Sequence, residues 1–399
     1  MSKKLTILFL LFAAACTQTY DVPSVFQLNV MVKYPSEINN GDVIRGATVK
    51  VKDVQSEREY SDITDESGMA TFEIRGGNYD IVTSVLEDRI MEEETKTFVF
   101  NGALNGHLLT AGNDEVVLQT GYTVLTSSFV IKELYVSGSR TPEGKNYKAD
   151  LFVEIYNNSD IPLFSDGLCF GTVCPTVTTR PTPFVDSEGN LLPRIPCWGF
   201  IAVVPGSGDE YPVQPGKSIV MALTGINHRD DPNGNPNSID LSKADWEFCV
   251  ENNGYYADSP EVPNLLMQRV TGGVRAMIFD VKGQTSILFR LPSENYEELF
   301  TNPDNFMIEP GGSERAFMVP REWIIDGVEN VRLDEIVYKR LPPEIDLGYI
   351  QHNGPGEKVS IRRKIKEVAA GRVIYLDTNN SSEDFLTNQE PQPGVISAY

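Results

Sequence analysis

The chain has 399 residues, enough for two or three domains of ordinary size. Hydrophobic residues make up 41% and charged residues 23%, so the chain can bury a core and is not disordered. The formal charge of −22 repels phosphate backbones, which excludes a broad nucleic-acid role. Three histidines in the whole chain leave little scope for His-rich metal sites.

The first residues have the features of a secretory signal. Lys3 and Lys4 precede an apolar or small run over 5–15, which is shorter than the roughly 20 residues of a membrane-spanning helix. Cys16 follows three alanines, and this arrangement resembles the lipobox of bacterial lipoproteins. The resemblance implies a cleaved signal peptide over 1–15, a lipid on Cys16 that contacts the membrane, and a tether over 16–23. An ordinary signal peptide with a chance cysteine is the alternative.

The residue after the cysteine bears on the destination of the protein. Thr17 stands where an aspartate would retain a lipoprotein in the inner membrane of well-studied Gram-negative bacteria. The resemblance therefore implies a lipid-anchored protein of the outer membrane, on its periplasmic face or at the cell surface.

Four cysteines remain in the exported part: Cys169, Cys174, Cys197 and Cys249. An oxidising compartment permits disulfides, and an even number fits two of them. Our first prediction pairs Cys174 with Cys197 and leaves Cys169 for Cys249. A Cys169–Cys174 bridge and four buried free thiols are the alternatives. No CxxC spacing occurs, so a zinc site is not indicated.

A small β-sandwich is predicted over residues 24–120. The runs Ala47–Lys52 and Ala70–Ile74 alternate apolar and polar residues, and turn residues separate the strand candidates. The set Gly46, Gly68, Phe72, Gly77 and Tyr79 resembles the carboxypeptidase regulatory-like (Cna-B-type) family. This resemblance implies a spacer or scaffold module.

A larger β domain is predicted over residues 127–399. Strand candidates lie at 129–136, 151–159, 197–204, 217–223, 274–280 and 284–290. The pairing of IKELYVSGS with LFVEIYNNSDIPL is similar to the lamin-tail immunoglobulin-like domain. The motifs NHRDDPNGNPNSIDLSKADWE, PREWIIDGVE and GRVIYLDTNNSSEDF resemble domain-of-unknown-function family 4876, whose members are uncharacterised Bacteroidota lipoproteins. We therefore expect an all-β protein with two consecutive β-sandwich, immunoglobulin-like domains after a cleaved signal peptide.

No motif in the chain indicates catalysis. It lacks a G-x-S-x-G elbow, an H-E-x-x-H pair and a phosphate-binding glycine loop. His107, His228 and His352 are far apart in sequence, although a triad is defined by its geometry in space. We therefore predict that the protein is not an enzyme and has no catalytic residues.

One loop has oxygen-bearing side chains at alternate positions, as calcium loops do. Its candidate ligands are Asp230, Asp231, Asn233, Asn235, Asn237 and Asp240. The same residue types are those that turns prefer, so a turn cluster is the stronger interpretation. A structural Ca²⁺ is the only cofactor that the sequence suggests.

Two further polar segments occur in the last forty residues of the chain. The loop 377–384 carries Asp, Asn and Ser residues and is predicted to be an Asx-type turn, with a cation site as the alternative. The basic run 360–366 is predicted to be a solvated strand face, with a binding patch as the alternative.

These features favour a non-catalytic lipoprotein that acts as a binding or assembly module. The family resemblance implies an accessory of a TonB-dependent nutrient-uptake system, with an outer-membrane receptor or a glycan as the partner. A surface hydrolase or carbohydrate-processing accessory, and a structural envelope protein, are the alternatives.

Overall fold

The fold is taken from a computed structural model. The described residues are 25–91, 94–110, 112–125, 128–251, 254–292, 296–334 and 337–396. The predicted signal peptide, the tether and the lipidated Cys16 lie outside them.

The predicted all-β class is confirmed. Strands predominate, and the described residues contain only two short α-helices, α1 (Tyr296–Thr301) and α2 (Ser381–Asp384), with three single-turn 3-10 helices at Asn39–Gly41, Pro303–Asn305 and Arg321–Trp323. None of the helices in these segments is long and apolar enough to cross a membrane.

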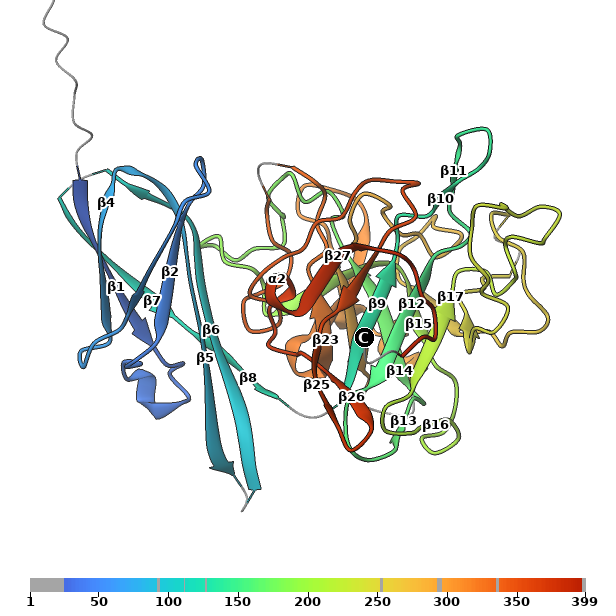
Figure 1. The fold of residues 1–399 in the computed structure, drawn as a ribbon, viewed down its shortest axis with the longest axis horizontal. Coiled ribbons are helices and arrows are strands. Elements are labelled where there is room, and N and C mark those ends of the chain that lie inside the picture. The colour runs from blue at the N-terminus through green and yellow to red at the C-terminus, as the bar shows by residue number, and fades with distance from the viewer. Residues whose placement is uncertain are drawn as a thin grey trace, which may run out of the picture.

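An N-terminal sandwich is formed by the first eight strands, drawn in blue to teal in Figure 1. They are β1 (Val25–Lys33), β2 (Thr48–Asp53), β3 (Glu59–Ile63), β4 (Met69–Arg75), β5 (Gly77–Met91), β6 (Glu94–Leu109), β7 (Asn113–Gln119) and β8 (Gly121–Leu125). One sheet has the order β4-β1-β7 and the other the order β3-β2-β5-β6-β8.

The alternation seen in the sequence decides which residues enter this core. In β4 every second residue is buried, and these residues, Ala70, Phe72 and Ile74, face the opposite sheet. Side chains of a strand point to alternate faces, so this pattern buries one face and leaves the other in solvent. Because β8 pairs with β6, the sandwich extends past residue 120.

The C-terminal module contains the remaining strands. They are β9 (Phe129–Tyr135), β10 (Ser139–Arg140), β11 (Asn146–Tyr147), β12 (Phe152–Asn157), β13 (Leu163–Phe164), β14 (Leu168–Val173), β15 (Arg194–Val203), β16 (Pro212–Val213), β17 (Ser218–Ala222), β18 (Trp246–Glu247), β19 (Leu266–Arg269), β20 (Ser286–Arg290), β21 (Phe306–Ile308), β22 (Arg315–Pro320), β23 (Ile324–Val328), β24 (Ser360–Arg363), β25 (Ile365–Ala369), β26 (Arg372–Tyr375) and β27 (Phe385–Gln389).

Two large sheets of this module enclose its main core. The first has the order β18-β17-β12-β9-β24-β27, and the second has β21-β22-β15-β14-β20-β23 with β19 added to β15. Ile131, Ile155, Phe170 and Leu288, which come from strands of both sheets, are fully buried between them. A sandwich of this kind buries one face of each sheet.

The second sheet is also buried on its other face. Cys169, Ile201, Phe289 and Phe317 form a further apolar cluster there, against Phe300 of α1. This explains why β14 and β20 read as nearly continuous apolar runs in the sequence rather than as alternating ones.

The predicted strand at 274–280 is absent. Val274, Met277 and Phe279 enter the main core, but their segment is irregular, and the nearby strand β19 lies earlier in the chain. The apolar residues signalled burial correctly. Gly273, with φ of +80°, leads into the segment in a backbone conformation unsuited to a strand.

The two modules touch through β6 and β8. The Asn101 amide donates to the carbonyl of Pro343 at 3.1 Å, and the Thr123 hydroxyl donates to the carbonyl of Glu344 at 2.6 Å. Lys50 of β2 lies 3.8 Å from Glu383 of α2. Figure 1 shows α2 on the side of the C-terminal module that faces the N-terminal sandwich.

Candidate functional site

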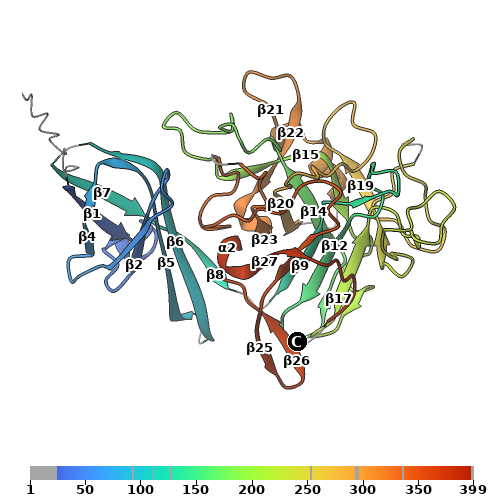
Figure 2. The same cartoon turned by 45° about the horizontal axis from the view of Figure 1, so that its top comes forward.

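A pocket lies at the β21–β22 edge of the second sheet of the C-terminal module and is also lined by the segment between β14 and β15. Figure 2 labels the β21–β22 hairpin at this edge of the sheet. Its volume is about 190 Å³. The lining residues are Cys174, Pro175, Thr176, Val177, Phe184, Trp198, Glu309, Glu314, Arg315 and Ala316.

The floor of the pocket is apolar and combines residues of β15 and β22 with residues of the segment between β14 and β15. Cys174, Phe184, Ala316 and Met318 form a small buried cluster, and Trp198 packs against it. Ala316 and Met318 alternate along β22, so they face the same side of the sheet. The Trp198 ring is therefore held by β15, and the Phe184 ring is held by its burial in this cluster, in the segment between β14 and β15.

Two carboxylates stand at the pocket. Glu309 and Glu314 flank the tip of the β21–β22 hairpin, and the Glu309 N–H donates to the Glu314 carbonyl at 2.9 Å. The Trp198 indole N–H donates to the Glu314 carboxylate at 2.5 Å. Burial raises the pKa of the Cys174 thiol, and the charges of Glu309 and Glu314 raise it further, so both carboxylates act on the pocket floor.

The one cationic residue of the lining is turned away from these carboxylates. Arg315 follows Glu314, and alternation along β22 places its side chain with Phe317 on the opposite face. There the guanidinium carbon lies 3.9 Å from the centroid of the Phe306 ring, and Nε donates to the Val270 carbonyl at 3.1 Å. The lining thus has two carboxylates at the pocket, and its one cationic group, the Arg315 guanidinium, lies on the opposite face of the sheet.

The four cysteines predicted to form two disulfides are free thiols in the structure, so neither predicted bridge is present. Cys174 and Cys197 come from neighbouring strand positions, but Cys197 packs on the outer face with Cys169, whereas Cys174 packs with Phe184. A disulfide needs Cβ atoms about 4 Å apart that point toward each other. Cys249 lies elsewhere, beside Glu247 and Asp258.

The predicted calcium loop is a set of local turns. Asp231 accepts the N–H of Asn233 at 2.8 Å, and Asp240 accepts the N–H and hydroxyl of Ser242. Asp230 accepts from the amide of Asn227 at 2.8 Å. Bonds between side chains and groups two or three residues away are expected for a cluster of turns, which is the stronger interpretation of this loop.

The asparagines of that loop are also engaged. The Asn235 amide donates to the Ser139 hydroxyl and to the Arg140 carbonyl, and the Asn237 amide donates to the same carbonyl. Asn233 contributes its N–H to the Asp231 turn. The loop is thereby fixed to the β10–β11 hairpin, and calcium binding stays a prediction.

One group of metal-ligating side chains occurs in the described segments, and the sequence did not indicate it. Glu247, Cys249 and Asp258 place one ligand atom each within 4.8 Å of the others. These groups already have partners: Glu247 accepts the Gly225 N–H at 2.8 Å, and Asp258 accepts from Asn264 at 2.9 Å. Burial raises the pKa of Glu247 to about 7.

The three histidines are separated in space as in sequence. His107 contacts Asp114 in the N-terminal sandwich at 2.9 Å. His228 is buried, with its ring nitrogens bonded to Tyr147 and to the Thr224 carbonyl, and burial lowers its pKa to about 4. His352 is buried beside Asn330. No serine or cysteine is hydrogen-bonded to them within the described ranges.

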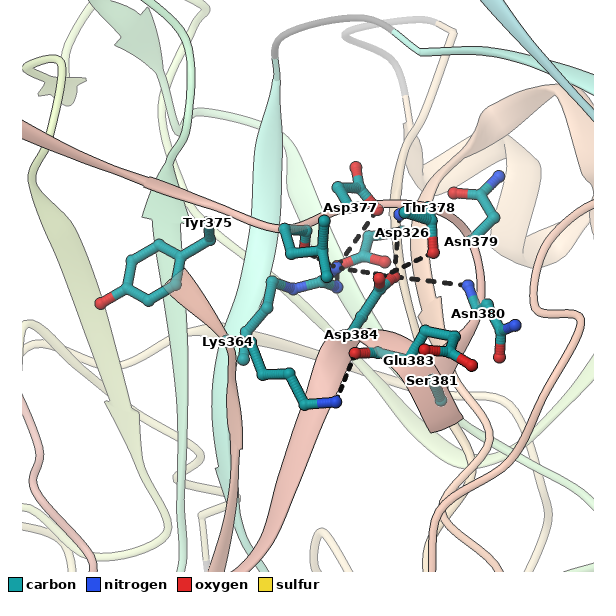
Figure 3. Close-up of polar contacts among 12 residues, drawn as sticks. Asp326, Lys364, Tyr375, Asp377, Thr378, Asn379, Asn380, Ser381, Glu383 and Asp384 are labelled. Carbon is teal, nitrogen blue, oxygen red and sulfur yellow. Dashed lines mark hydrogen bonds and ion pairs between the residues drawn. The ribbon is translucent and has the colours of Figure 1, made fainter. Parts of the chain in front are cut away.

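The basic run and the polar loop singled out in the sequence meet in a buried ion cluster. Asp326, Asp377 and Asp384 converge in Figure 3. The guanidinium of Arg363 bonds to Asp326, donates to Asp377 at 3.2 Å and lies 3.6 Å from Asp384. Burial alone would lower the pKa of Arg363, but the three carboxylates raise it above its ordinary value.

The prediction of a solvated strand face for 360–366 is therefore wrong for its arginines. The Arg363 side chain is 1% exposed, and Arg362 pairs with the fully buried Glu133 at 3.1 Å. Carboxylates from distant strands compensate these charges. The predicted Asx-type turn over 377–384 is not what the structure has: residues 381–384 form the short helix α2, and the Asp384 carboxylate accepts from the N–H and hydroxyl of Thr378, six residues earlier.

Comparison with known proteins gives a family match for part of the chain but no activity. The family model for a protein of unknown function, DUF4876, matches residues 214–392. This part of the chain is a DUF4876 domain. Strands β9, β12, β14 and β15 precede the matched range but lie in the same two sheets, so the folded module begins earlier than the match.

The solved structure of a DUF4876 family protein from Bacteroides thetaiotaomicron supports the fold. It covers 94% of this chain and 99% of its own, with 23% identity and a TM-score of 0.59. A putative carbohydrate binding protein from Pseudomonas aeruginosa covers 24% of this chain and 89% of its own, with 13% identity and a TM-score of 0.20. No curated protein matches the chain.

The pocket was almost invisible in the sequence. Trp198 and Phe184 precede the matched range, whereas Glu309 and Glu314 lie within it, more than a hundred residues along the chain from Trp198. The one local sign was the E-P-G-G-S-E turn at 309–314, which places two glutamates at the ends of a hairpin tip.

Proposed function

We propose that this protein is a non-catalytic lipoprotein of the outer membrane that binds a partner through the Trp198 pocket. The observation that carries the proposal is the pocket itself, in which Trp198 of β15 lies beside two carboxylates at the tip of the β21–β22 hairpin. Concave apolar sites with a few fixed polar groups are the usual place of ligand binding.

The arrangement of the two modules suits this role. The N-terminal sandwich, which begins at residue 25, lies between the proposed lipid anchor and the C-terminal module. It would act as a spacer that carries the pocket away from the membrane. In this proposal, the partner that binds the Trp198 pocket is an outer-membrane receptor of a TonB-dependent nutrient-uptake system.

A photo-crosslinking experiment tests the proposal. A benzophenone amino acid replaces Ser313, which is exposed at the hairpin tip between Glu309 and Glu314, in the lipidated protein in its own membrane. The matched control places the same group at Ser56, which is exposed in the N-terminal sandwich. We expect a defined adduct with an outer-membrane receptor from position 313 only.

A second substitution tells specific binding from chance proximity. Trp198→Ala in the Ser313 variant should abolish the adduct, because it removes an aromatic wall of the pocket. An adduct that persists with Trp198→Ala, or that forms equally from position 56, contradicts the proposed function.

The anchor is tested separately. Cys16→Ala should prevent acyl labelling and release the protein from membranes, since burial of acyl chains at ~0.8 kcal/mol per CH₂ is the proposed source of membrane affinity. Cell fractionation with acyl labelling checks this, and a Cys16→Ala protein that is still labelled rules out the lipoprotein assignment.

A further inference from the structure

We propose that the Trp198 pocket binds the ammonium group of a lysine side chain. This inference rests on the proposed function and names the chemistry by which a partner would be recognised.

The size of the pocket excludes large ligands. A volume of about 190 Å³ lies below the roughly 300–1,000 Å³ of sites for drug-sized molecules or longer oligosaccharides. One extended side chain with a small head group fits such a space. The partner would therefore insert a single residue and would not bury a chain of sugars.

The charge of the pocket selects a cation. Glu309 and Glu314 are opposite each other at the end of the β21–β22 ladder, where like charges destabilise a hairpin. The guanidinium of Arg315 does not relieve this repulsion, because it stacks on Phe306 at the opposite face of the sheet. A bound ammonium would lie between the two carboxylates and offset their repulsion.

The walls of the pocket suit an aliphatic stem that ends in a charge. Trp198, Phe184, Val177 and Pro175 supply apolar surface to the methylene groups of a lysine. An indole ring also attracts an ammonium electrostatically when the cation lies over its face. The hydrogen bond from the Trp198 N–H to Glu314 fixes the ring and the carboxylate relative to each other.

Fluorine NMR of protein labelled with 5-fluorotryptophan provides the test. The chain has three tryptophans, and Trp198→Phe assigns the signal of interest. The ligand is lysine blocked as the N-acetyl N-methylamide, and the matched neutral ligand is norleucine blocked in the same way. We expect blocked lysine to shift the Trp198 signal saturably and to bind at least roughly tenfold more tightly than norleucine, which corresponds to the attraction of an aromatic ring and carboxylates for a cation.

Charge removal gives the decisive variant. Glu309→Gln with Glu314→Gln keeps the shape of both side chains, and it should remove the preference for lysine over norleucine. The control pair Glu188→Gln with Glu322→Gln removes the same charge from exposed positions outside the pocket and should leave the preference intact. A preference that persists in the Glu309/Glu314 variant overturns the inference.

The remaining outcomes separate this inference from the proposed function. If norleucine binds as well as lysine, the pocket binds a side chain, but the ammonium inference is wrong. If butylammonium binds and blocked lysine does not, the pocket accepts a free amine but has no room for the peptide backbone attached to a lysine. The lysine assignment is then wrong. If no ligand shifts the signal while the position-313 adduct forms, the inference fails and the proposed function stands.

Discussion

At the scale of single residues, the buried charges of the C-terminal module are the features most open to test. Arg363 is enclosed by Asp326, Asp377 and Asp384, and its guanidinium carbon also lies 4.5 Å from the centroid of the Phe385 ring. A buried ion set of this kind adds little net stability compared with an apolar core, but the loss of one partner leaves the others uncompensated.

Arg363→Met should therefore destabilise the protein by about 3–5 kcal/mol at neutral pH. The loss should be smaller in mild acid, because burial already raises the pKa of Asp326 to about 7 and that of Asp384 to about 6, and protonation removes their uncompensated charge. Urea unfolding at the two pH values measures the difference. Arg275→Met, at an exposed position, is the control, and an equal loss in both variants would contradict this account.

Glu247 gives a second pH-dependent prediction, in which the variant is more stable than the wild type. Burial raises its pKa from 4.5 to about 7, so the folded protein holds a proton there that the unfolded chain releases. The stability that this group contributes is complete below pH 4.5 and is lost as the pH rises through 7. Glu247→Gln does not ionise, and its one amide oxygen can accept the N–H groups of both Gly225 and Ser259, as Oε2 of Glu247 does.

The Glu247→Gln variant should therefore be more stable than the wild type above pH 7, by up to about 3 kcal/mol, and equally stable in mild acid. Thermal unfolding across this pH range measures the effect, and Glu261→Gln at an exposed position nearby is the control. A constant difference at all pH values would show that the carboxyl does not titrate between folded and unfolded states.

At the scale of secondary-structure elements, the C-terminal segment 390–396 covers charged groups on the first sheet of the C-terminal module. Lys132 and Glu154 form a fully buried pair at 2.7 Å. The Gly394 N–H donates to Glu154 at 3.2 Å, and the Gln392 N–H donates to Glu133 at 3.1 Å. Burial raises the pKa of Glu154, while Lys132 lowers it.

Removal of residues 391–399 should cost about 3 kcal/mol, because two carboxylates each lose a backbone donor. Deletion of 397–399 alone retains Gln392 and Gly394 and serves as the matched control. Chemical denaturation of both proteins measures the cost, and equal stability would mean that this segment contributes nothing to the sheet.

Strands could be predicted from the sequence where only one face of the strand is buried. The alternating runs that became β2 and β4 were assigned correctly because a period of two has one structural explanation. The segment 274–280 was misassigned because apolar residues report burial and not strand pairing. Arg363 was misplaced because local sequence does not show which carboxylates other strands will bring to it.

The candidate site could not be predicted either, because strand pairing brings together residues that are distant in the sequence. Trp198 belongs to β15 and Glu314 precedes β22, and only the pairing of these strands makes them neighbours. The cysteine spacing was also misleading, since Cys174 and Cys197 are near along the ladder yet pack in different clusters. Spacing along a chain does not indicate the face of a sheet on which a side chain lies.

At the scale of the whole molecule, the contact between the modules decides how far the pocket is held from the anchor. Gly121 begins β8 at this contact, and a Cβ atom there would lie 2.9 Å from the Glu344 carboxylate and 3.0 Å from its Cβ. The Asn379 amide also donates to the Glu344 carbonyl at 2.8 Å, so Glu344 is held by the same loop that carries the Arg363 ion cluster.

Gly121→Val should separate the modules without unfolding either one. The valine would displace the backbone at Glu344, and the bonds from Thr123 and Asn101 to the adjoining carbonyls would be lost, at about 1 kcal/mol each. Small-angle scattering should then report a larger radius of gyration, while each sandwich retains a cooperative transition, because the N-terminal core lies wholly within its own two sheets. Gly272→Val, at a glycine with no atom within 4 Å of its would-be Cβ, is the control and should scatter as the wild type does. An unchanged radius in the Gly121 variant would mean that the contact through β6 and β8 does not fix the arrangement of the modules.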